Sequence, residues 1–126
     1  MANTTKLLIV EDDLLLDEAY RRKFADLYDL RVAADGDAAI KMLSSWDPEV
    51  ILLDIYMPGK YNGLDVLKII KDNPKHARVP VLVITNLPDS IDRVIGMGAA
   101  KCFMKTDIDL GKIEEELAEV VAKSVK

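Results

Sequence analysis

The sequence has few of the features that mark secreted, disulfide-bonded or membrane-spanning proteins. It contains one cysteine, Cys102, which excludes an internal disulfide framework. Its apolar runs reach only about five residues, whereas a membrane-spanning helix needs roughly 20. Residues 1–6 lack the long apolar segment of a signal peptide. These absences predict a soluble, cytoplasmic protein with no membrane partner.

Positive charge is also scarce, since 17 Lys and Arg residues stand against 22 Asp and Glu residues, for a formal net charge of −5. A negative field repels nucleic acid phosphates and anionic lipid headgroups, so we expect no nucleic acid partner. The 126 residues, of which 50% are hydrophobic, suffice for one core. We therefore expect residues 1–126 to form a single domain, without an output domain.

Short apolar runs alternate with segments of helical period, which is the pattern of α/β proteins with a parallel sheet. The expected strands are Lys6–Val10, Leu30–Ala33, Val50–Asp54, Val81–Thr85 and Lys101–Lys105. The first, third and fourth are almost wholly apolar, as strands covered by helices on both faces are. We expect these three strands at the centre of the sheet.

Five helices are expected between and after these strands. The second covers roughly Asp37 to Trp46, the third Leu64 to Asp72, and the short fourth Asp89 to Met97, with Asp89 or Ser90 as its cap. The buried stripe of the first helix comprises Leu16, Ala19, Tyr20, Phe24 and Leu27, and that of the fifth comprises Leu110, Ile113, Leu117, Val120 and Val121. Five such βα units predict a flavodoxin-like, doubly wound five-stranded parallel sheet in the order 2-1-3-4-5.

Acidic residues follow two of the expected strands. Glu11, Asp12 and Asp13 come directly after the first strand, and Asp54 ends the third. In this strand order the two carboxyl ends meet at the switch point, where repulsion between carboxylates demands a cation or a proton. A hard cation such as Mg²⁺ prefers one or two carboxylates plus waters and phosphate oxygens. Asp12 and Asp54, with Glu11 or Asp13 bound through water, would suffice.

Asp54 could also act as a nucleophile, because carboxylates accept phosphoryl groups to form aspartyl phosphates. Thr85 and Lys105 end the fourth and fifth strands, so they would supply a hydroxyl donor and a cation at the same edge. The residues therefore predict a metal-dependent phosphoryl site.

In their order and spacing, these residues resemble the receiver domains of the response regulator family of two-component signalling. The resemblance covers essentially the whole chain and is carried by Leu8–Asp13, Ile51–Gly59, Asn62–Leu64, Thr85, Gly98–Ala100 and Lys105. It implies that Asp54 takes a phosphoryl group from a histidine of a sensor kinase or of a histidine phosphotransfer protein.

The same resemblance implies the remaining roles. Asp12, Asp54 and the backbone carbonyl of Tyr56 would bind Mg²⁺, with Glu11 bound through water. Lys105 would pair with the phosphoryl oxygens. The hydroxyl of Thr85 would move toward them and so alter binding to a downstream protein target. Such a protein is a phospho-acceptor and not a turnover enzyme.

The sequence departs from the family's usual pattern at several points, which include a span from Thr85 to Lys105 that is about two residues short and predicts a truncated fourth helix. Cys102 replaces the aromatic residue that commonly partners Thr85, Thr106 follows Lys105 where proline is usual, and Lys60–Tyr61 lengthen the loop after the acceptor motif. The changes at Cys102 and Thr106 affect the expected switch and not the acceptor chemistry.

Residues outside the motif are expected to have simpler roles. We expect His76 to be exposed and without a function, Trp46 to pack in the core and Cys102 to be a small buried hydrophobe. Leu14 and Leu15 fall off the buried stripe, next to the acidic edge. Exposed there beside Leu87–Pro88, they would form an apolar surface suited to docking a helix of the kinase or phosphotransfer protein, although partial burial by loops is an equal alternative.

Two other functions remain open. A Mg²⁺-dependent phosphohydrolase could also pass through an aspartyl phosphate, but such enzymes generally place an acid/base carboxylate two residues after the nucleophile, where Tyr56 stands here. A phosphate-independent interaction module would need neither the acidic pair nor Thr85 and Lys105.

Overall fold

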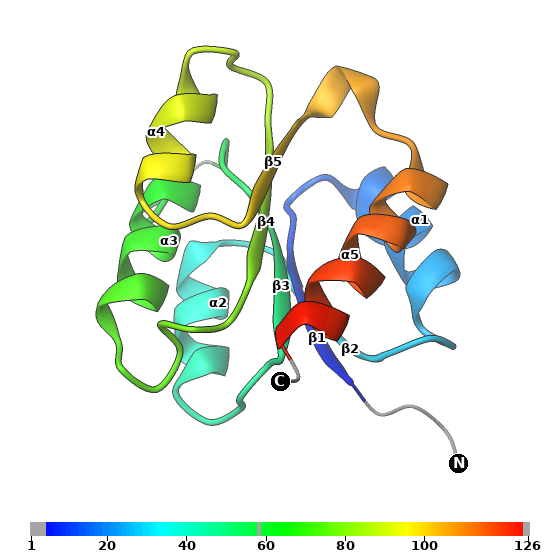
Figure 1. The fold of residues 1–126 in the computed structure, drawn as a ribbon, viewed down its shortest axis with the longest axis horizontal. Helices are drawn as coiled ribbons and strands as arrows, with labels where there is room; N and C mark the ends of the chain where they lie inside the picture. The colour runs from blue at the N-terminus through cyan, green and yellow to red at the C-terminus, as the bar shows by residue number, and fades with distance from the viewer. Residues whose placement is uncertain (1–4, 58, 125–126) are drawn as a thin grey trace.

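The computed structural model describes residues 5–57 and 59–124, so Pro58 of the expected acceptor motif lies outside the described part. The five strands form one parallel sheet in the order β2-β1-β3-β4-β5, as predicted (Figure 1). The elements in chain order are β1 (Lys6–Val10), α1 (Leu14–Phe24), β2 (Asp29–Ala33), α2 (Gly36–Leu43), β3 (Val50–Asp54), α3 (Gly63–Asp72), β4 (Val81–Thr85), α4 (Ser90–Gly96), β5 (Lys101–Met104), a 3₁₀ turn (Lys105–Asp107) and α5 (Leu110–Ser124).

Helices cover both faces of the sheet, with α1 and α5 on one face and α2, α3 and α4 on the other (Figure 1). Successive strand residues point to opposite faces, so each central strand contributes to two cores. Leu7, Ile9 and Leu52 pack with α1 and α5, whereas Leu8 and Leu53 pack with α2, α3 and α4. The three apolar strands β1, β3 and β4 occupy the centre of the sheet, as expected.

Several element bounds differ from the sequence prediction; β2, α3 and α4 differ by one residue at one or both ends, and the larger or more informative differences are in α1, α2 and β5. Helix α1 stops at Phe24 and the chain turns, with Leu27 N donating to Phe24 O, so Leu27 is 40% exposed and does not belong to the buried stripe. Helix α2 ends at Leu43, but Trp46 is buried as predicted, with Arg31 over its ring at 4.5 Å. Strand β5 stops one residue before Lys105.

The prediction that His76 is exposed and without a role is wrong. Its side chain is only 2% exposed, and its Nε2 lies 3.0 Å from Asp47 Oδ1, which links the α3–β4 connection to the segment before β3. Lys71 fixes the same connection by donating to the carbonyls of Ala77 (3.1 Å) and Val79 (2.9 Å). His76 is therefore a structural residue at the edge of the sheet where the strands begin.

Over the described residues, no helix is both long enough and apolar enough to cross a membrane.

Candidate functional site at the carboxyl edge of the sheet

Three carboxylates meet where β1 and β3 end. The two strands are paired in register up to Val10 and Leu53. One oxygen from each of Glu11, Asp12 and Asp54 lies within 4.8 Å of the others. The sequence-predicted acidic cluster is therefore formed.

Asp13 is not part of this cluster. Its Oδ1 accepts hydrogen bonds from Leu15 N (2.9 Å) and Leu16 N (3.2 Å), so its carboxylate caps the first turn of α1. This cap fixes the direction in which α1 leaves the acidic edge. Leu14 and Leu15, the first residues of that helix, are each 80% exposed, so loops do not bury them, and their role in docking stays a prediction.

Strand alternation decides the side of the sheet from which each group acts. Asp54 follows Leu52 by two residues, so it shares the face of the sheet covered by α1 and α5. Thr85 follows Val83 by two residues, so it shares the opposite face, covered by α3 and α4. The expected acceptor and the expected hydroxyl donor therefore leave the same edge in opposite directions.

Lys105 is the counter-ion of the buried carboxylates. Its Nζ lies 2.9 Å from Asp54 Oδ2 and 3.3 Å from Glu11 Oε2, and both acidic residues are only 2% exposed. The second oxygen of Asp54 accepts a hydrogen bond from Tyr56 N at 3.1 Å. Both oxygens of Asp54 are thus held by donors, which orients the carboxylate.

The site carries more negative charge than one lysine can balance. Burial, and then the charge of Asp54, raise the pKa of Glu11 to about 7. Burial acts to lower the pKa of Lys105, but its hydrogen bonds and charge interactions with Asp54 and Glu11 outweigh burial and raise it. Lys105 therefore stays an ammonium ion, and a proton on Glu11 or a further cation relieves the remaining repulsion.

The donor set fits a hard divalent cation. Glu11, Asp12 and Asp54 offer only carboxylate oxygens, which suit Mg²⁺ better than the softer metals that select thiolate or imidazole. Asp12 is the most accessible of the three, so it can accept an ion entering from solvent. The backbone carbonyl of Tyr56 stays a predicted ligand.

A glycine brings helix α3 against the acceptor strand. Gly63 N donates to Ile55 O at 2.9 Å, and a Cβ at Gly63 would lie 2.3 Å from Ile55 Cα and 2.4 Å from Asp54 O. Asn62 and Asp65 form a reciprocal capping box at the same helix start. No side chain larger than hydrogen fits here unless the backbone at Asp54 moves.

Two polar groups at this edge of the sheet, one beside the acidic cluster and one beside Thr85, were not foreseen from the sequence. Tyr20 was expected only to be buried. Among the described residues, its hydroxyl is also the one buried side-chain nitrogen or oxygen atom that has no hydrogen-bond partner. Burial, and then the charges of Glu11 and Asp54, raise its pKa, so the hydroxyl lies within reach of their field. Ser90, considered only as a helix cap, shares a hydrogen bond with Thr85 at 2.8 Å.

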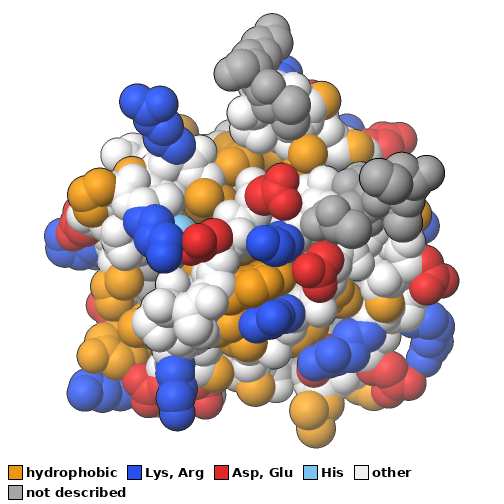
Figure 2. Space-filling view, turned by 90° about the horizontal axis from the view of Figure 1, so that it is seen from below, with side chains coloured by type: hydrophobic (Ala, Val, Ile, Leu, Met, Phe, Trp, Pro, Cys, Tyr) orange, Lys and Arg blue, Asp and Glu red, His pale blue; other side chains and the backbone are white. Residues whose placement is uncertain are grey.

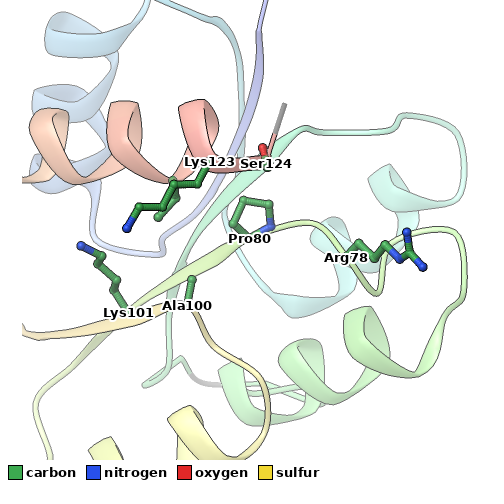
Figure 3. A pocket seen from close by; sticks show the side chains of 7 residues that line it. Arg78, Pro80, Ala100, Lys101, Lys123 and Ser124 are labelled. Atoms are coloured by element: carbon green, nitrogen blue, oxygen red, sulfur yellow. The ribbon is translucent and has the colours of Figure 1, made fainter. Parts of the chain in front are cut away.

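A hollow at the opposite end of the molecule is a weaker candidate for a ligand-binding site than the acidic cluster. Figure 2 shows positive and negative side chains interspersed around an apolar centre, seen from below. A hollow of about 290 Å³ is lined by Lys101 and Lys123 among others, as Figure 3 shows. Both lysines already pair with Glu119 (3.0 and 3.1 Å), so they offer little free positive charge to a ligand.

A family model for the response regulator receiver domain matches residues 7–118. This chain belongs to that family. Among curated relatives, the receiver is similar to response regulator PleD of Caulobacter vibrioides, with 34% identity over 110 residues, 84% of this chain and 24% of PleD. The receiver spans less than half the length of the other curated relatives of comparable similarity.

Solved structures agree with the fold of this receiver. The receiver domain of the Francisella response regulator 1452 superposes with a TM-score of 0.85 over 98% of this chain and 100% of that one, at 22% identity. The Mn²⁺-bound form of response regulator Rcp1 matches with a TM-score of 0.74 and 27% identity, over 93% of this chain and 88% of that chain. The doubly wound topology is therefore that of receiver domains.

Proposed function

We propose that this receiver accepts a phosphoryl group on Asp54 in a Mg²⁺-dependent reaction, from a phosphohistidine of a sensor kinase or of a histidine phosphotransfer protein. It then signals by altered binding to a downstream protein. The observation that carries the proposal is the environment of Asp54, a buried carboxylate held by Lys105 and by Tyr56 N beside two further acids.

The residues of the site suit this transfer. An oxygen of Asp54 forms a bond to phosphorus as the bond from phosphorus to the donor histidine nitrogen breaks. Lys105, 2.9 Å from Asp54 Oδ2, is positioned to balance negative charge on the phosphoryl oxygens. Mg²⁺ held by Asp12, Asp54 and the Tyr56 carbonyl, with Glu11 through water, would supply further charge neutralisation.

The Mn²⁺-bound form of Rcp1 supports a divalent cation in a protein of this family. We infer the same for this chain because its own acidic cluster has the matching donor chemistry. A turnover phosphohydrolase is less well supported, since Tyr56, two residues after Asp54, is 68% exposed and offers no carboxylate for acid/base catalysis.

Labelling with a small phosphodonor tests the proposal. We expect acetyl phosphate to modify Asp54 only when Mg²⁺ is present, because the bare carboxylates repel an anionic donor. Mass spectrometry of the intact protein and of its peptides measures the label and its position. Asp35→Asn, which changes an acid that caps α2 through Ala38 N, is the matched control and keeps full labelling. Label that persists in Asp54→Asn or in EDTA contradicts the assignment.

A further inference from the structure

Three hydrogen bonds join the end of β4 to the start of α4. Ser90 Oγ donates to Leu87 O at 2.7 Å, and Leu87 N donates to Thr85 Oγ1 at 3.0 Å. Thr85 Oγ1 and Ser90 Oγ lie 2.8 Å apart. We call this ring of Thr85, Leu87 and Ser90 the Ser90 latch.

The direction of each bond follows from counting hydrogens. A hydroxyl has a single hydrogen to donate. The hydrogen of Ser90 goes to Leu87 O, so the contact between the two hydroxyls uses the hydrogen of Thr85. Thr85 is fully buried, and the two hydrogen-bond partners of its hydroxyl are Leu87 in the turn before α4 and Ser90, the first residue of α4. Thr85 therefore cannot donate elsewhere unless the latch opens.

The segment that carries the latch is lightly held. Helix α4 has seven residues, and its N-cap Asp89 makes no side-chain capping bond. Leu87 is 53% exposed. A cavity of about 280 Å³ lies beside the turn, lined by Ile55, Leu64, Leu87, Asp89, Ser90 and Arg93. The turn can therefore shift without displacing the closely packed core.

We propose that Ser90 is the positioning residue that keeps Thr85 in its resting orientation, and that a phosphoryl group on Asp54 opens the latch by taking the hydrogen of Thr85. This rests on the proposed function. A charged phosphoryl oxygen is an acceptor roughly twice as strong as a neutral hydroxyl. As Thr85 turns toward it, Ser90 and Leu87 N lose their bonds to Thr85, and the first turn of α4 is released.

The residue at position 102 is a cysteine, which cannot couple Thr85 to the surface as an aromatic ring would, so the coupling in this chain must take another route. Cys102 pairs with Val83 and packs on the α2, α3 and α4 side of the sheet, the side to which Thr85 belongs. A thiol is too small to fill space by rotating. Ser90 joins Thr85 directly to α4, so it couples the site to the surface without an aromatic ring.

Binding of beryllofluoride, a phosphoryl mimic, with Mg²⁺ tests the latch. Ser90→Ala removes the hydrogen bond to Thr85, which is made only in the resting state, so we expect it to tighten beryllofluoride binding by about three- to tenfold. Ser44→Ala is the matched control, because Ser44 Oγ likewise donates to a carbonyl three residues earlier, that of Lys41, at 2.6 Å. Calorimetry measures the affinities, and unchanged or weaker binding by Ser90→Ala overturns the proposal.

A double-mutant cycle separates the latch from a general loosening of α4. In a Thr85→Ala background, Ser90→Ala should no longer change the affinity for beryllofluoride, because the partner that it releases is absent. An equal gain in that background overturns the proposal. If Ser90→Ala does not fold, Ser90→Cys repeats both measurements with a weaker hydrogen-bonding group.

A measurement without any phosphoryl mimic keeps the two proposals distinguishable. Scalar couplings of a labelled Thr85 methyl group report its side-chain rotamer. We expect one rotamer in the wild type and averaging in Ser90→Ala, and one unchanged rotamer in both overturns the latch. Failure of the wild type to bind beryllofluoride with Mg²⁺ would instead contradict the proposed function.

Discussion

Glu11 makes the stability of the metal-free protein depend on pH. Its ordinary pKa of 4.5 applies to the unfolded chain, and the folded pKa is about 7. Between these values the folded state binds more protons, so its stability falls as pH rises, by up to about 3 kcal/mol in total. We expect Glu11→Gln to flatten this slope in urea unfolding from pH 4.5 to 7.5 with EDTA. Equal slopes in wild type and variant would contradict the inference, and the exposed Glu115→Gln serves as the control.

The buried hydroxyl of Tyr20 makes no hydrogen bond in this structure, so it lowers the stability of the folded state. Tyr20→Phe keeps the ring contact with Phe24 and removes only the oxygen. We expect the free energy of unfolding without metal to rise by about 1 kcal/mol. Denaturant unfolding measures this difference. A loss of similar size would show that the hydroxyl has an acceptor after all, and Tyr28→Phe, on a partly buried ring, is the control.

At the scale of elements, the start of α3 is the most constrained contact with the site. Gly63→Ala would place a methyl group within 2.4 Å of backbone atoms of Asp54 and Ile55. We expect a loss of about 1–3 kcal/mol in unfolding free energy and weaker phosphoryl labelling, because the backbone next to the acceptor must shift. Gly96→Ala meets nothing within 4 Å and should be neutral or stabilising. Similar stability losses in both variants would exclude the steric explanation.

Strong periodic patterns predicted the elements, and local patterns predicted the acidic cluster. The apolar runs of β1, β3 and β4 placed them at the sheet centre, and the acids that follow two of them met as expected. The burial of His76 could not be foreseen, because its partner Asp47 lies 29 residues away and only the tertiary fold joins them. The hydrogen bond between Ser90 and Thr85 was missed for a different reason, because a serine near a helix start is interpreted first as a helix cap.

At the scale of the whole molecule, a bound cation should stabilise the fold. Mg²⁺ binds the folded acidic cluster and not the unfolded chain, so at ten times its dissociation constant it should add about 1.4 kcal/mol. Thermal unfolding at pH 8 with and without Mg²⁺ measures the gain, which Asp12→Asn should abolish. Asp13→Asn should keep it, because an asparagine retains the cap on α1. Loss of the gain in Asp13→Asn would assign the water-mediated contact to Asp13.

The alternation of side chains along β3 and β4 has a consequence for how this protein can change over evolution. Asp54 belongs to the side of the sheet shared with α1 and α5, whereas α4 covers the other side, and in the proposal above Thr85 links the two. Substitutions that retarget the α4 surface to a new partner therefore need not disturb the residues that handle the phosphoryl group. A single layer of five strands keeps the two sets of selective constraints apart.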